Sequence, residues 1–65
     1  MSKESIDNLE TIVDSIEKDY RNGKNISITL LSTLMTIKTA RTNEHNKPYE
    51  DTLTALESRL EKLRS

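Results

Sequence analysis

The sequence contains no cysteine, tryptophan or phenylalanine, and it has a single glycine and a single proline. Without cysteine, neither a disulfide nor a thiolate metal site can stabilise a small core. The near absence of glycine and proline, without any low-complexity tract, excludes a disordered tail as the main content and leaves few points where a helix must end. The missing cysteines are also compatible with a reducing compartment, and we expect a cytoplasmic protein.

The sequence also lacks an excess of charge of either sign. Ten basic and eleven acidic side chains give a formal net charge of −1. A protein dedicated to duplex nucleic acid normally carries a basic surplus, so we do not expect direct duplex binding.

Long apolar runs are missing as well. No stretch approaches the roughly 20 apolar residues that span a bilayer. Residues 1–10, MSKESIDNLE, have no apolar centre of the kind found in signal peptides. We therefore expect neither a membrane span nor export.

The chain has 65 residues, 32% of them hydrophobic. This length predicts one helical domain over residues 1–65 with a thin core, and such small domains are commonly stabilised by association with another chain. We therefore expect a second copy of the chain or another protein as a partner.

A first helix is predicted over residues 5–21. Apolar residues recur there at alternating spacings of three and four, which is the period of one helix face. They are Ile6, Leu9, Val13, Ile16 and Tyr20. Ser2 or Ser5 can cap the start of this helix, and Gly23 favours its termination.

The central segment, residues 26–42, has the densest apolar patch. In a helix its large apolar side chains occupy an arc of about 200°. They are Ile26, Ile28, Leu30, Leu31, Leu34, Met35 and Ile37. Residues 26–30 alternate as a strand would, but no second strand is available to pair with them, so we predict a helix that Asn25 or Ser27 caps.

A third helix is predicted over residues 48–64, after a polar turn at residues 43–47. Pro48 suits the first position of a helix. The apolar seam of this helix is Tyr49, Leu53, Leu56, Leu60 and Leu63. The fold is therefore predicted as an all-α, antiparallel, up-down-up three-helix bundle; the alternative is a long helical hairpin, against which Gly23 and Pro48 both count.

The sequence contains no motif that is typical of a catalytic site. The one histidine, His45, lies in a polar turn between Glu44 and Asn46, and no spacing of histidines, cysteines or carboxylates matches a metal site. No serine lies in a glycine-rich turn that would expose a nucleophile. We expect no enzyme activity, no metal and no cofactor.

An interface is predicted on the central segment. If Leu30, Leu34 and Ile37 form its core seam, a second strip of apolar residues remains, which either completes the core or forms an association surface. Small hydroxyl side chains on the opposite side would let another helix approach closely. The candidate interface residues are Ile28, Leu31, Met35, Thr29, Thr33 and Thr36.

The alternative function is binding of a small phosphorylated ligand or nucleotide. Lys38 and Arg41 lie near the end of the central helix, and we expect Tyr49 close by. These two cations either form an anion pocket or pair with carboxylates of the chain. The carboxylates considered for that pairing are Asp7, Glu10 and Glu50.

Residues 9–17, LETIVDSIE, and residues 56–63, LESRLEKL, resemble the small subunit of exonuclease VII. That resemblance implies a short helical accessory subunit, but the threonine-rich centre and Pro48 depart from the family pattern. The residues themselves predict a non-catalytic interaction module, such as a small inhibitor, adaptor or accessory subunit. Small size and the lack of an active site also suit a phage or mobile-element protein.

Overall fold

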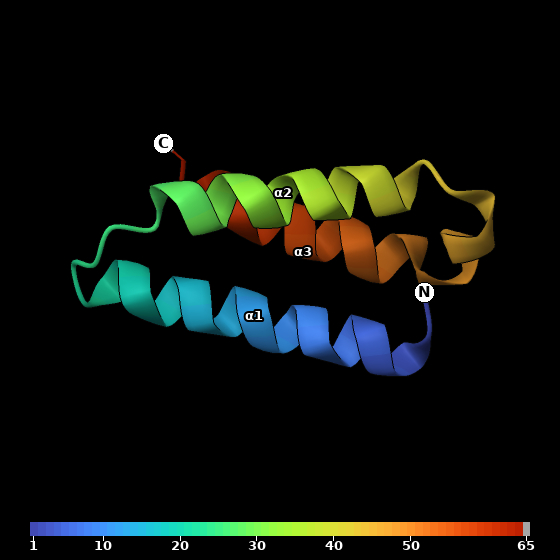
Figure 1. Ribbon diagram of the computed structural model, residues 1–65, viewed down its shortest axis with the longest axis horizontal. Helices are drawn as coiled ribbons and strands as arrows, with labels where there is room; N and C mark the ends of the chain where they lie inside the picture. The colour runs from blue at the N-terminus through green and yellow to red at the C-terminus, as the bar shows by residue number, and fades with distance from the viewer. Residues whose placement is uncertain (65) are drawn as a thin grey trace.

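The computed structural model describes residues 1–64, and in that part of the chain every regular element is helical. In chain order, the elements are α1 (Lys3–Arg21), α2 (Ser27–Arg41), the 3₁₀ helix η1 (Glu44–Tyr49) and α3 (Glu50–Lys62). Figure 1 shows the chain running from right to left in α1, back in α2, and from right to left again in α3. The predicted all-α fold of three helices is confirmed, and α2 packs more closely against α3 than against α1.

Helix α1 begins two residues before its predicted start. The Ser2 Oγ accepts a hydrogen bond of 3.2 Å from the Ser5 N–H, so Ser2 is the capping residue. The helix ends in a Schellman motif, in which Lys24 N–H donates to the Asp19 carbonyl and Gly23 N–H to the Tyr20 carbonyl. This motif requires a left-handed residue after the cap, and Gly23 supplies it with φ of 76°.

Helix α2 confirms the helical prediction for the central segment. The side chain of Asn25 accepts a hydrogen bond of 3.0 Å from the Ser27 N–H at the start of the helix. No acidic residue lies in its first turn. Lys38 and Arg41 complement the helix dipole in the last turn. Because its many β-branched residues have a low helix propensity, the helical state of this segment depends on packing against its neighbours.

The prediction for Pro48 is wrong. Pro48 was expected at the first position of the third helix, but α3 begins at Glu50 and Pro48 lies inside η1. The same 3₁₀ helix occupies most of residues 43–47, where a polar turn was expected. Two asparagines stabilise this 3₁₀ turn: Asn43 accepts from the His45 N–H at 2.9 Å, and the buried Asn46 side chain donates to the Ala40 carbonyl at 2.9 Å. The first bond satisfies a backbone N–H at the start of η1, and the second satisfies a carbonyl near the end of α2.

The core lies between the three helices and is formed by the predicted seams. Its buried apolar residues are Ile6, Leu9, Val13, Ile16, Leu30, Leu34, Ile37, Leu53, Leu56 and Leu60. Tyr20, which was predicted in the first seam, is 47% exposed instead, because it lies in the last turn of α1, where the core ends.

Charged pairs connect the helices across the edges of this core. Arg59 of α3 bonds to both Glu17 and Asp14 of α1, the latter at 2.6 Å, and its guanidinium lowers the pKa of Glu17. Arg41 of α2 bonds to Glu57 of α3 at 2.9 Å. Among residues 1–64, no helix is both long enough and apolar enough to cross a membrane.

Candidate protein-interaction surface

Three large apolar side chains of α2 lie outside the core. Ile28 is 83% exposed, Leu31 is 56% exposed and Met35 is 70% exposed. We call these three residues the α2 strip. The sequence left open whether they complete the core or face outward, and the structure places them outward.

The helical period explains this exposure. Leu30, Leu34 and Ile37 form one stripe that faces α1 and α3 and is almost fully buried. At about 100° per residue, Leu31 is rotated by roughly 60° from Leu34, and Met35 by roughly 100°. Two neighbouring helices cover one side of α2, and the α2 strip lies beyond their reach.

The predicted threonine positions divide between surface and core. Thr29 and Thr36 are exposed beside the α2 strip. Thr33 is buried, with 7% exposure, so its assignment to an interface is wrong: it belongs to the stripe that packs inside the protomer. The Thr36 hydroxyl donates to the Ser32 carbonyl at 3.0 Å, which turns its polar atom back toward the helix.

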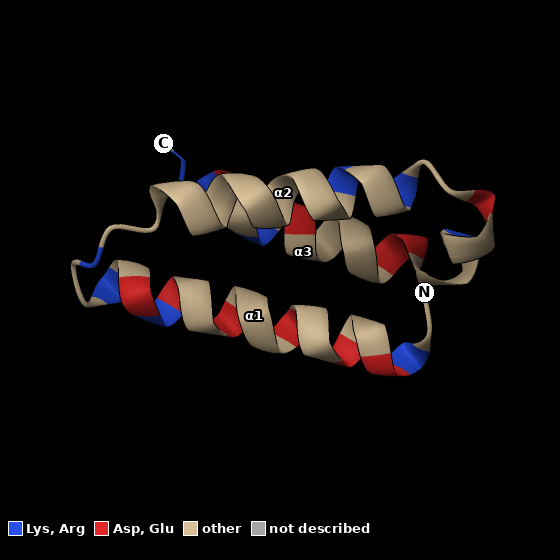
Figure 2. Ribbon diagram, in the orientation of Figure 1, with Lys and Arg blue, Asp and Glu red and all other residues tan. Residues whose placement is uncertain are grey.

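The outward side of α2 carries little charge. In Figure 2, α2 is tan over most of its length, whereas α1 shows red residues along its length and blue residues near both ends. The charged residues of α2 are Lys38 and Arg41, both in its last turn. The α2 strip is therefore the centre of an uncharged surface that ends at two cations.

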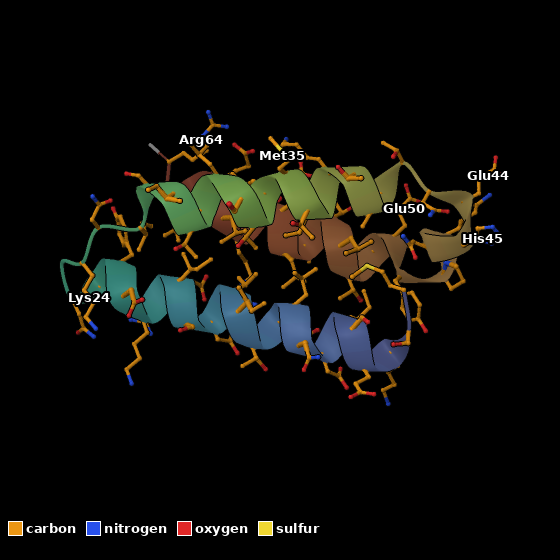
Figure 3. The ribbon with its side chains drawn as sticks, in the orientation of Figure 1. Lys24, Met35, Glu44, His45, Glu50 and Arg64 are labelled. Atoms are coloured by element: carbon orange, nitrogen blue, oxygen red, sulfur yellow. The ribbon has the colours of Figure 1, made fainter. Side chains whose placement is uncertain are left out.

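Two grooves border the α2 strip, and they share Leu31 and Arg64. The smaller groove has a volume of about 220 Å³ and is lined by Leu31, Leu34, Met35, Lys38, Thr39 and Arg64. The larger has a volume of about 410 Å³ and is lined by Tyr20, Lys24, Asn25, Ile26, Ser27, Leu30, Leu31, Leu63 and Arg64. Figure 3 shows Met35 and Arg64 projecting from the outer side of the α2–α3 pair, away from α1.

The anion pocket predicted from Lys38, Arg41 and Tyr49 is not assembled. Lys38 lies 3.4 Å from carboxylate oxygens of both Glu57 and Glu61, and Arg41 bonds to Glu57. A hydrogen bond from Arg41 lowers the pKa of Glu57, so this carboxylate stays ionised beside the two cations. Tyr49 is half-buried and packs against the core.

The carboxylate partners predicted for these cations are also wrong. Asp7, Glu10 and Glu50 were considered, and the partners are Glu57 and Glu61 of α3. Glu57 and Glu61 are one helical turn apart and next to the core residues Leu56 and Leu60. This spacing was visible in the sequence, but the rotation of α3 against α2 that selects these two was not.

Arg64 was also missed as part of the surface. It follows α3 and lines both grooves. His45 is exposed in η1, and among residues 1–64 no group of three histidine, cysteine, aspartate or glutamate side chains is placed to hold a metal ion.

Comparison with known proteins adds no relative from which a function can be transferred. No family model, no curated protein and no solved structure matches the chain. A function for this chain therefore has to be inferred from the α2 strip and its grooves.

Proposed function

We propose that this protein is a non-catalytic interaction module that binds another protein through the α2 strip. The observation that supports this proposal is the exposure of three large apolar side chains on one helix, in one continuous strip. Isolated exposed apolar residues are common, but a contiguous strip bordered by grooves is typical of an association surface. A small inhibitor, adaptor or accessory subunit, acting in the cytoplasm, fits such a surface.

A methionine in the α2 strip supports the same function. Met35 is unbranched and flexible, so it can adapt its shape to a partner at little cost. Beside it, Ser32, Thr36 and Thr39 line a shallow hollow with small side chains that let a second backbone approach closely.

The proposal is tested by capture of partners from a lysate of the source organism on immobilised wild-type protein and on two variants. Met35→Glu places a charge in the α2 strip, and Ala55→Glu places the same charge on an exposed position of α3. We expect a protein that is retained by wild type and by Ala55→Glu and is lost with Met35→Glu. Because Met35 is 70% exposed, far-UV circular dichroism should remain that of wild type in both variants. Equal capture of the same proteins by all three would contradict the proposal.

Self-association is the second form of this proposal, and it is measured separately. Light scattering over a dilution series should show a dimer or larger species in wild type and a monomer in Met35→Glu if the α2 strip binds a second copy. A monomer for both proteins at high micromolar concentration would leave a different protein as the partner.

A further inference from the structure

We infer that the α2 strip and its two grooves bind an acidic amphipathic helix of a partner protein. This inference rests on the proposed function and specifies the chemistry of the partner. Three observations support it: the adjacent positions of the two grooves along α2, the sign of the charges that line them, and the outward position of those charges.

The two grooves are neighbours along α2. The larger lies at the start of α2 and the smaller beside its middle, and both contain Leu31 and Arg64. Helix α2 has 15 residues, which corresponds to about 22 Å at 1.5 Å per residue. A partner helix of about four turns matches this length, and apolar side chains spaced three or four residues apart would enter the two grooves in succession.

Among residues 1–64, the charges that line these grooves have one sign. The charged residues of that part of the chain in the two linings are Lys24, Lys38 and Arg64, and none of its carboxylates lines either groove. A helix whose apolar face contacts the apolar lining of the grooves therefore has cations along the edges of that face. Glutamate or aspartate flanking the apolar stripe of the partner complements this arrangement.

The cations also lie further out than the carboxylates that pair with them. The side chain of Lys38 is 53% exposed against 17% for Glu57, and that of Arg64 is 50% exposed against 37% for Glu61. The side chain of Lys24 is 67% exposed against 42% for Asp19. An approaching helix thus meets the cations first, although the pairs are close to neutral in sum.

Exchange of these partners costs little. The ion pairs of Lys24, Lys38 and Arg64 are at the surface, with separations of 3.8, 3.4 and 3.3 Å. Surface pairs of this kind contribute little to stability, because water already screens them. A carboxylate of the partner can therefore replace or share Glu61 without unfolding the end of α3.

The same charges argue against the other occupants. Two α2 strips that face each other would oppose the cations of one copy to those of the other. A flat anionic membrane would contact the α2 strip but leave the grooves beside it unfilled. A small phosphorylated ligand would contact the cations but would leave the exposed apolar side chains of the α2 strip uncovered.

The inference is tested with three fluorescein-labelled peptides of about 16 residues, a length that spans α2. All carry leucines at spacings of three and four; the remaining positions are mostly glutamate in the first, glutamine in the second and lysine in the third. Fluorescence anisotropy with wild-type protein should give a Kd for the glutamate peptide at least about tenfold below that of the glutamine peptide, and no saturation with the lysine peptide. Raising the salt from about 50 to 500 mM should remove most of that difference.

Matched variants separate charge from apolar contact. The double variant Lys38→Gln, Arg64→Gln keeps Lys24 in the lining of the larger groove and should lose most of the preference for the glutamate peptide. The double variant Lys3→Gln, Lys47→Gln changes the net charge by the same amount outside the two groove linings and should retain the preference. Met35→Glu should weaken the binding of both peptides.

Several results would overturn the inference. Equal affinity of wild type for the glutamate and glutamine peptides would remove the acidic partner but leave an apolar docking surface, and the proposed function with it. Absence of binding to any of the peptides would also overturn the inference, while the capture experiment with Met35→Glu would still decide the proposed function. Sedimentation of the protein with phosphatidylglycerol vesicles, without peptide binding, would assign the surface to a membrane instead.

Discussion

Glu57 of α3 connects α3 to α2 through ion pairs with Lys38 and Arg41. Its carboxylate accepts from Arg41 at 2.9 Å and lies 3.4 Å from the Lys38 ammonium, with a side chain only 17% exposed. The hydrogen bond from Arg41 is the main reason that the pKa of Glu57 is lowered, and Lys38 adds to it against the opposing effect of burial. This pair therefore links stability to pH.

A lowered folded-state pKa makes the unfolded chain bind the proton more readily than the folded chain. The stabilisation is therefore present above the ordinary glutamate range and is lost as the pH falls through the folded-state pKa. We expect the free energy of unfolding, measured by urea titration, to fall between about pH 5 and pH 3, and to fall less steeply in Glu57→Gln. Glu17→Gln should have a similar and additive effect, because the pKa of Glu17 is lowered separately by Arg59. Parallel pH profiles for wild type and both variants would contradict this prediction.

At the scale of elements, the apolar seams predicted three helices, and the structure has them. The seams work because a spacing of three and four residues is a local property of each helix. No bound differs by more than two residues. Around Pro48 the proline suggested the start of α3, whereas the structure has a 3₁₀ turn there, with hydrogen bonds from Asn43 and Asn46. The sequence identified both asparagines as polar turn residues but did not show which backbone groups they satisfy.

The candidate surface was predictable in composition but not in orientation. Ile28, Leu31 and Met35 were identified as a second strip, yet either a buried or an exposed position was compatible with their spacing. The choice depends on how α1 and α3 are placed around α2, which also decides that Thr33 is buried and that Glu57 pairs with Arg41. These are contacts between helices, and the periodicity of a single sequence does not determine how the helices are rotated against one another.

The connection between α1 and α2 gives a prediction at this scale. Gly23 has φ of 76°, and a Cβ at this position would have no heavy atom within 4 Å, so the effect of a side chain is conformational rather than steric. Gly23→Ala should destabilise the protein by about 1 kcal/mol, because a left-handed conformation is unfavourable for alanine. In a domain of this size, that lowers Tm by about 4–8 °C. Gly23→Asn should lower Tm less, since asparagine enters this region more readily; a larger loss for Asn than for Ala would contradict the explanation.

For the whole molecule, the thin core makes every buried side chain important for all three helices. The core contains residues from α1, α2 and α3, and the molecule measures 36 × 20 × 16 Å, so no helix has a core of its own. A domain of this size has a total stability of roughly 3–10 kcal/mol. The free energy lost when one large core side chain is truncated is therefore comparable with the free energy of unfolding of the entire domain.

Leu53 and Met35 test this relation as a matched pair. Leu53 is 0% exposed and Met35 is 70% exposed, so truncation to alanine removes a core contact in one case and surface contacts in the other. Leu53→Ala should lower the free energy of unfolding by about 2–5 kcal/mol. The circular dichroism signal at 222 nm should then be lost in a single unfolding transition that includes all three helices. Met35→Ala should change the free energy of unfolding by less than about 0.5 kcal/mol while weakening binding at the α2 strip. If Met35→Ala destabilised the protein as much as Leu53→Ala, Met35 would be a core residue, and the interaction surface proposed on α2 would lose one of its three apolar side chains.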